Sequence, residues 1–273
     1  MILASPWIAG LVALFLWWFS TGAILCAVRR ADRGGAVARR RVVILSLPLA
    51  VLGSVGFWMT LSDGSLGGAY LAFFSALALW GWAELAFLAG IITGPNDSHL
   101  PPAAPEWERF LRAWGTIAYH ELLLVALMTA MVALARGAEN LVGVLTFGVL
   151  FAARVSAKLN LYLGVSKINT EFLPEPLTHL PSHFRSARMN WLFPISITAL
   201  TFATAVFVVQ AVLATGAAGA VGYALVAALT ALALLEHWFL VLPLPDERLW
   251  RWMLPEPHTT TTPQATRLSE DIR

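Results

Sequence analysis

Long uncharged apolar runs constrain this chain more than any other feature of its sequence. Seven of them can cross a membrane, because a spanning helix needs about 20 mainly apolar residues. Short charged connections separate the runs, and only 12% of all residues are charged, about half the share found in soluble domains. The pattern predicts an all-α, polytopic integral membrane helix bundle. The expected spans are Pro6–Val28, Val42–Leu61, Ala69–Thr93, Trp114–Arg136, Leu141–Leu163, Trp191–Gly216 and Val221–Leu242.

Basic residues favour one orientation of these spans. The first connection, RRADRGGAVARRR, is rich in arginine, and the third and fifth also carry Lys or Arg, whereas the second and sixth carry neither. Lysine and arginine concentrate on the cytoplasmic side of membrane proteins. We therefore expect a periplasmic N-terminus and a cytoplasmic C-terminus. Residues 1–254 are expected to form one transmembrane domain, followed by a disordered cytoplasmic tail over 255–273, where apolar periodicity is missing.

Two segments beside the spans alternate aromatic and charged residues at helical spacing. They are EWERFLRAW, over Glu106–Trp114, and DERLWRWML, over Asp246–Leu254. Amphipathic helices of this kind lie in the plane of the membrane interface. We expect both to lie along the cytoplasmic headgroups.

Several function classes are disfavoured. The one cysteine, Cys26, excludes a disulfide framework or a thiolate metal cluster within one chain. The basic residues cluster at span ends, which indicates membrane orientation and no nucleic-acid partner. The sequence also lacks a phosphate-binding Gly-rich loop, a Gly-x-Ser-x-Gly elbow and a His-Glu-x-x-His motif. We therefore expect a protein that is not an enzyme.

Polar residues inside the expected spans form the candidate site. An unpaired ionisable side chain at the centre of a bilayer costs at least ~2.5 kcal/mol, so such residues need partners or a function. The ionisable ones all fall roughly 8–14 Å from the expected cytoplasmic boundary, at 1.5 Å of helix per residue, and Asn160 adds a neutral polar group. The sequence predicts that they form one intramembrane polar cluster. Its expected members are Glu84, His120, Glu121, Arg154, Lys158, Asn160, Glu236 and His237.

Different roles are compatible with this cluster. Buried pairs can hold four helices in register, or the same groups can bind a polar ligand, a metal or a pigment. His120 or His237 could ligate the magnesium of a chlorin through a neutral ring nitrogen. The histidines and carboxylates could instead form a metal site inside a helical bundle, although the separated Glu-x-x-His pattern of such sites is missing.

The segment EFLPEPLTHLPSHFR, over Glu171–Arg185, is the most unusual loop. His179 and His183 superficially match a histidine box, but Pro181 lies between them and disfavours a regular helix. Six histidines in the whole chain are also too few for an enzyme of the desaturase type. The loop is better interpreted as a docking surface on the cytoplasmic face. Its proposed contact residues are Glu171, Phe172, Leu173, Pro174, Phe184 and Arg185.

Four longer strings carry a family resemblance. They are YHELLL from Tyr119, RVSAKLNLYLGVSKINTEFLPE over Arg154–Glu175, MNWLFPISIT over Met189–Thr198 and LEHWFLVLPLPDERLWRWML over Leu235–Leu254. Together they resemble the photosynthetic complex assembly protein 2 family, PuhE, of anoxygenic phototrophic bacteria. The family pattern has tyrosine-like residues at the positions of His179 and His183, which argues further against a histidine box.

The resemblance implies a multi-pass protein of the bacterial inner or intracytoplasmic photosynthetic membrane. Its expected role is non-catalytic assembly of the reaction centre–light-harvesting 1 core complex, or regulation of its bacteriochlorophyll supply. The implied partners are reaction-centre or light-harvesting 1 subunits, other assembly factors and membrane lipids, with bacteriochlorophyll as a transient pigment. The alternatives are a membrane-embedded metal-dependent enzyme of pigment or lipid metabolism, and a pigment carrier.

Overall fold

The computed structural model describes residues 2–168, 170 and 173–242. Its described part is all-helical, and seven stretches are long and apolar enough to cross a membrane. This confirms the predicted all-α fold with seven candidate spans, and the chain is a multi-pass membrane protein. The elements are η1 (Ile2–Ala4), α1 (Pro6–Asp32), α2 (Gly35–Leu45), α3 (Leu47–Thr60), α4 (Leu66–Leu88), α5 (Glu106–Leu134), α6 (Val142–Leu163), η2 (Glu175–Leu177), η3 (Leu180–His183), α7 (Leu192–Leu213) and α8 (Ala217–Phe239).

The second span is built from two helices. Together α2 and α3 cover Gly35–Thr60, so this span begins seven residues before the predicted start at Val42. The helix is interrupted at Ser46, one residue before the Leu47-Pro48 start of α3. Proline lacks the N–H that a continuous helix needs and tolerates only the first turn, which explains why the break falls here.

The segment Glu106–Trp114, predicted to lie along the cytoplasmic headgroups, is not a helix of its own, and its place relative to the membrane stays a prediction. These residues form the first turns of α5, which continues without interruption to Leu134. The buried face of this segment carries Arg109, whereas Trp107, Phe110, Leu111 and Trp114 are all exposed, an arrangement that still suits the membrane interface. The second segment predicted to lie at the interface, Asp246–Leu254, falls outside the described residues, as does the predicted tail over 255–273.

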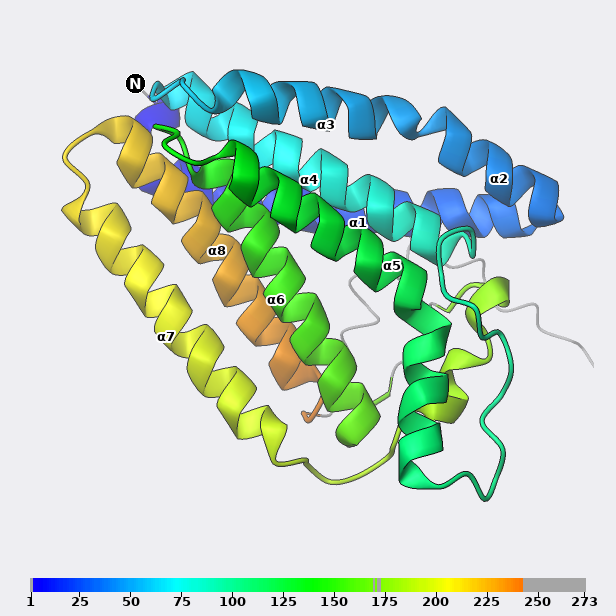
Figure 1. The fold of residues 1–273 in the computed structure, drawn as a ribbon. Helices are drawn as coiled ribbons and strands as arrows, with labels where there is room; N and C mark the ends of the chain where they lie inside the picture. The colour runs from blue at the N-terminus through cyan, green and yellow to red at the C-terminus, as the bar shows by residue number, and fades with distance from the viewer. Residues whose placement is uncertain (1, 169, 171–172, 243–273) are drawn as a thin grey trace, which may run out of the picture.

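The helices form a wedge (Figure 1). Helices α1 to α4 run side by side toward one end, while α6, α7 and α8 run toward another, and the two groups converge near the N-terminus. The C-terminal part of α5 runs beside α4, whereas its N-terminal part is bent away from α4. The ends that carry the α1–α2, α4–α5 and α6–α7 connections are therefore spread apart, whereas the opposite ends are packed together.

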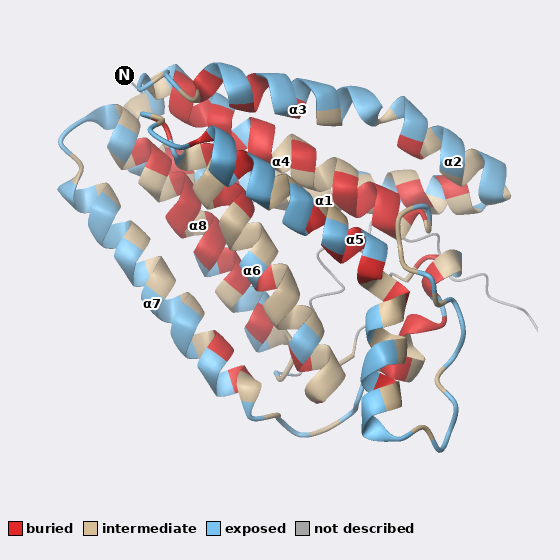
Figure 2. Cartoon of the chain, in the orientation of Figure 1, coloured by how far each residue is buried: buried red, intermediate tan, exposed pale blue. Residues whose placement is uncertain are grey.

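The converging end holds the main apolar core. Helices α4 and α8 are the most buried (Figure 2), and Phe73 of α4 packs with Leu225 and Leu229 of α8 and with Ala13 of α1. Without water around the helices, such contacts stabilise mainly through close van der Waals packing. Helices α3 and α7 expose most of their length, as expected for helices at the edge of a membrane bundle.

The loop after α6 folds back onto the end of α4. Leu177 and Leu180 are buried against Phe87 of α4, and Leu173 and Phe184 pack around this small core. Gly90 ends α4 with a φ of +71°, and a Cβ there would meet Pro176. The apolar side chains expected to dock a partner are thus largely used inside the chain.

Candidate functional site

The bend in α5 places His120 against α4. The His120 N–H donates to the carbonyl oxygen of Thr93, at 3.0 Å, and the Asn96 N–H donates to that of Gly115, also at 3.0 Å. The connection from α4 thus inserts its backbone into the α5 hydrogen-bond ladder, which is a recognised cause of helix bending. Only glycine fits at position 94, because a Cβ there would lie 2.0 Å from the Gly115 oxygen.

Two ion pairs join α6 to its neighbours. Arg154 Nη2 lies 2.7 Å from Glu84 Oε2 on α4, and Lys158 Nζ pairs with Glu121 Oε1 on α5. Arg154 and Lys158 are four residues apart, so both point from the same face of α6. The Glu84, Glu121 and Lys158 side chains are almost buried, while that of Arg154 is 34% exposed. Each buried carboxylate therefore has its own cation, as burial of charge requires.

Phe87 lies at the centre of these charges. Its ring centroid is 4.6 Å from that of His120, 5.0 Å from Lys158 Nζ and 5.9 Å from Arg154 Cζ. Cations within about 6 Å of an aromatic face are attracted to it. Phe87 is not recognisable from the sequence, because it occurs in an apolar run and is distinguished only by its position three residues after Glu84. We call Glu84, Phe87, His120, Glu121, Arg154 and Lys158 the charged group.

His120 is completely buried, and its ring nitrogens are not hydrogen-bonded to any described residue. Its Nε2 lies 3.6 Å from Glu84 Oε1, which is also without a hydrogen-bond partner among the described residues. The separation exceeds a hydrogen bond. The imidazole nitrogens are enclosed by protein, so a bulky ligand cannot reach them in this conformation.

Asn160 and His237 belong to a second, neutral group between α6, α7 and α8. His237 Nε2 lies 2.9 Å from Ser156 Oγ and its Nδ1 lies 2.8 Å from the Ala233 carbonyl oxygen. Asn160 Nδ2 donates to Ser196 Oγ at 3.0 Å. Both ring nitrogens of His237 are therefore engaged, and neither has a free lone pair directed at open space.

Asn190 completes this neutral group. Its amide donates to Asn160 Oδ1 at 3.0 Å, and its Oδ1 accepts from the N–H groups of Leu192 and Phe193. Asparagine before an apolar run is a usual helix-start signal, so this residue could have been found from the sequence. We call Ser156, Asn160, Asn190, Ser196 and His237 the neutral group.

The single cluster expected from the sequence is thus divided. Arg154 and Lys158 on α6 are offset by two residues from Ser156 and Asn160, which is about 200° around a helix, so the two pairs serve opposite faces. Glu236 belongs to neither group, because its Oε1 accepts from Trp17 Nε1 of α1 at 3.0 Å on an exposed face. Helix α8 ends at Phe239, so Glu236 lies in its last turn.

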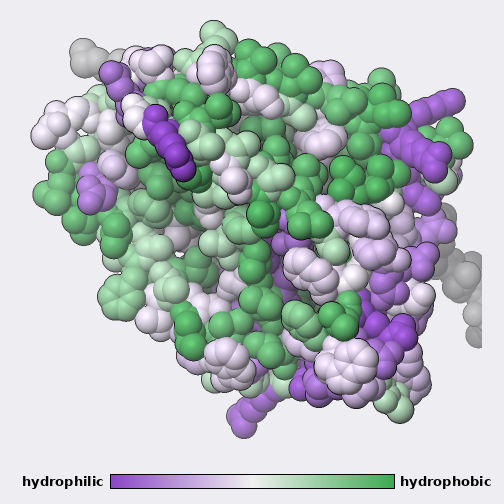
Figure 3. All heavy atoms as spheres, viewed as in Figure 1, coloured by the Kyte–Doolittle hydropathy of each residue, from purple (hydrophilic) through white to green (hydrophobic). Residues whose placement is uncertain are grey.

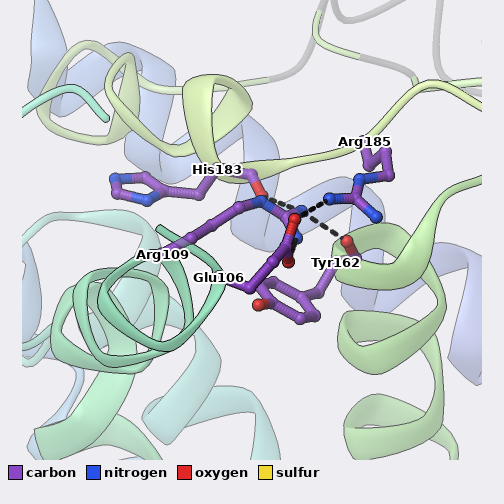
Figure 4. A network of polar contacts seen from close by, with 5 residues as sticks. All are labelled: Glu106, Arg109, Tyr162, His183 and Arg185. Carbon is purple, nitrogen blue, oxygen red and sulfur yellow. Dashed lines mark hydrogen bonds and ion pairs between the residues drawn. The ribbon is translucent and has the colours of Figure 1, made fainter. Parts of the chain in front are cut away.

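Arg109 fixes the start of α5 to the end of α6 and the following loop (Figure 4). Its Nη2 donates to the carbonyl oxygens of Tyr162, at 2.6 Å, and His183, at 3.2 Å, and its guanidinium lies 4.0 Å from the Tyr162 ring centroid. Glu106 Oε2 lies 3.4 Å from Arg109 Nη1, and Glu106 Oε1 lies 2.5 Å from Arg185 Nη2. Of the predicted docking residues, Arg185 is therefore ion-paired within the chain, and Glu171 and Phe172 lie outside the described residues.

The two loop histidines do not form a histidine box. His183 Nε2 lies 3.1 Å from the Ser98 carbonyl oxygen, and Pro181 lies inside the short η3 helix. Burial lowers the pKa of both His179 and His183 from the ordinary value of 6.5. Within residues 2–168, 170 and 173–242, no three His, Cys, Asp or Glu side chains are placed to hold one metal ion.

A separate open hollow of about 220 Å³ lies at the converging end of the bundle. Asp63, Glu139 and Tyr223 contribute to its lining. It contains none of the residues of the charged or neutral groups, so it is not part of the site predicted from the sequence.

The fold and the site define a class, a multi-pass helical membrane protein with ion pairs between the helices of its bundle. The sequence matches the family described as "Protein of unknown function (DUF3623)" over residues 3–261, and the chain belongs to this family. It is also similar to a Rhodobacter capsulatus protein, "Uncharacterized 30.4 kDa protein in puhA 5'region". The two are 54% identical over 251 residues, which are 92% of each chain. No solved structure matches.

Proposed function

We propose that this protein is a non-catalytic assembly factor for the photosynthetic reaction centre–light-harvesting 1 core complex in the bacterial inner membrane. The resemblance to the PuhE family supports this role. So does the relative from the puhA 5' region, because that position links the relative to the photosynthesis gene cluster. The proposed partners are core-complex subunits or other assembly factors.

The observation that carries the proposal is the internal pairing of the charged group. Glu84 is held by Arg154 at 2.7 Å, and Glu121 is held by Lys158. A general acid, a base or a nucleophile must reach its substrate, whereas these carboxylates are nearly buried and bonded to cations of the same chain. The arrangement suits a frame that keeps α4, α5 and α6 in one geometry for a partner.

The same geometry favours protein contacts over pigment ligation by the predicted histidines. A chlorin magnesium needs a neutral imidazole nitrogen that is accessible to the macrocycle. His120 is completely enclosed, and both nitrogens of His237 are already engaged. A regulatory effect on bacteriochlorophyll supply would therefore act through a partner protein.

Complementation of a deletion strain tests this proposal. Glu121→Gln and Arg154→Ala should each lower the yield of core complex, measured by near-infrared absorption of the membranes, while immunoblots show normal amounts of the variant. Thr201→Val is the matched control, since Thr201 Oγ1 bonds only within its own helix, to the Ile197 carbonyl oxygen. It should give the wild-type yield.

Three results would contradict the proposal. Normal core-complex yield in the deletion strain would exclude a role in assembly. Loss of Glu121→Gln and Arg154→Ala from the membrane would show that these residues serve folding alone. Stoichiometric iron or zinc in the purified wild-type protein would favour the metal-dependent enzyme.

A further inference from the structure

A dense group of unpaired arginines occupies the corner where α1 turns into α2. Arg30 and Arg33 at the end of α1, and Arg40 and Arg41 on α2, are all exposed. None of these four side chains makes a hydrogen bond or an ion pair within the part of the chain that the structure describes. We call them the arginine corner.

The neighbouring Arg39 shows why these four have no acidic partner. Arg39 Nη1 lies 3.1 Å from Glu175 Oε2 and 3.7 Å from Asp32 Oδ1. Asp32 Oδ2 also accepts from the Glu175 N–H, at 3.3 Å. The two carboxylates at this corner are thus used to attach the loop at Glu175 to the α1–α2 connection. The four outer arginines remain available to a partner outside the chain.

The position of the corner indicates the kind of partner. Helix α1 has 27 residues, about 40 Å at 1.5 Å per residue, whereas the hydrocarbon core is about 30 Å thick. Its last turns therefore reach the headgroup layer. Val37 and Ile44 of α2 are each more than 60% exposed beside the arginines, a mixture suited to the membrane interface. Figure 3 shows strongly hydrophilic atoms next to hydrophobic ones at the end where Figure 1 places this connection.

We propose that the arginine corner binds the phosphate headgroups of anionic phospholipids. Guanidinium groups form paired, charge-assisted hydrogen bonds with phosphate oxygens. Clusters of four to eight basic residues next to a spanning helix attract anionic lipids, and each residue raises the affinity about fivefold. The depth of the corner and its exposed apolar neighbours favour a lipid over an acidic soluble protein. This inference is independent of the proposed assembly function.

Native mass spectrometry of the full-length protein in mild detergent tests the inference. The protein is titrated with phosphatidylglycerol or with phosphatidylcholine of the same acyl chains. We expect the wild type to retain phosphatidylglycerol in preference to phosphatidylcholine. Arg40→Gln with Arg41→Gln should weaken that binding roughly 30-fold, since each of the two arginines contributes about a fivefold gain in affinity.

Two further variants make the result specific. Arg136→Gln with Arg188→Gln removes two exposed arginines elsewhere and should leave the preference unchanged. Arg40→Lys with Arg41→Lys keeps the charge and should retain most of the binding, which excludes misfolding as the cause of the loss. Equal binding of the two lipids by the wild type would overturn the inference. An equal loss in both glutamine pairs would also overturn it, because the effect would then be one of net charge alone.

Discussion

The charged group and the neutral group lie on opposite faces of α6 and differ in the interactions that hold their side chains. In the charged group, Arg154 and Lys158 each neutralise one carboxylate, and the His120 ring is enclosed without a hydrogen-bond partner in the described residues. In the neutral group, Ser156, Asn160 and His237 are linked by ordinary hydrogen bonds between uncharged atoms. Loss of one ion-pair partner from the charged group leaves a buried charge, whereas loss of a residue from the neutral group costs only hydrogen bonds between uncharged groups. The two faces should therefore respond to mutation with different magnitudes.

Breaking the Lys158–Glu121 pair should have the largest effect. Lys158→Met leaves Glu121 nearly buried and without its cation, which we expect to lower the free energy of unfolding by about 3 kcal/mol. The measurement is unfolding of the purified protein in mild detergent. The double variant Lys158→Met with Glu121→Gln should recover at least half of the loss, because no uncompensated charge remains. A double variant as unstable as the single one would show that the pairing is not what stabilises this face.

The next effect is expected at the point where the backbone of the α4–α5 connection enters α5. A Cβ in Gly94→Ala would overlap the Gly115 oxygen, so the connection must shift and release His120 from Thr93. We expect a loss of about 1–3 kcal/mol, as for other overpacked sites. Gly216→Ala is the control, since nothing lies within 4 Å of a Cβ there. Equal stability of the two variants would show that the close approach does not determine the bend.

The neutral group should show a smaller loss. Ser196 Oγ accepts from Asn160 Nδ2 at 3.0 Å and from Ser156 Oγ at 2.9 Å. Ser196→Ala removes both bonds, but Asn160 Nδ2 keeps its bond to the Ser156 carbonyl oxygen, so stability should fall by about 1–2 kcal/mol. The same unfolding assay measures it, with Thr201→Val as the control. A loss as large as that of Lys158→Met would remove the distinction between the two faces.

Mild acid should have the smallest effect, confined to the loop. Because burial holds the pKa of His179 and His183 below 6.5 in the folded protein, the unfolded chain binds more protons at acidic pH. Stability is therefore complete above about pH 6.5 and falls as the pH decreases from there toward the folded-state pKa. Hydrogen exchange should rise at residues 173–190 between pH 7.5 and 5.5, after correction for intrinsic rates. A His179→Gln, His183→Gln variant that keeps the full pH dependence would contradict this explanation.

The seven spans could be predicted from the sequence because each is a local property of apolar length. The exact ends could not, because they depend on contacts between distant segments. The spacing of aromatic and charged residues identified Glu106–Trp114 as amphipathic, but only the fold reveals that its Arg109 bonds to Tyr162 and His183. The predicted orientation of the helices in the membrane is independent of these contacts and stays a prediction.

The candidate site was predictable in membership and less so in arrangement. Charge inside a span identified Glu84, Glu121, Arg154 and Lys158, and the structure pairs them. Their pairing depends on which helices are neighbours, and the divergence of the two halves of the bundle is not encoded in any local pattern. The role of Phe87 could not be predicted for the same reason, since an aromatic residue in a span looks ordinary until the fold places cations around it.

The absorption spectrum of the protein, purified in mild detergent from phototrophically grown cells, tests the central claim most directly. The account predicts that the protein, once separated from the core-complex subunits that co-purify with it, shows no bacteriochlorophyll band, because His120 is enclosed and both ring nitrogens of His237 are hydrogen-bonded. A bacteriochlorophyll band that disappears in His120→Ala or His237→Ala would contradict it and would make the site a pigment-binding one.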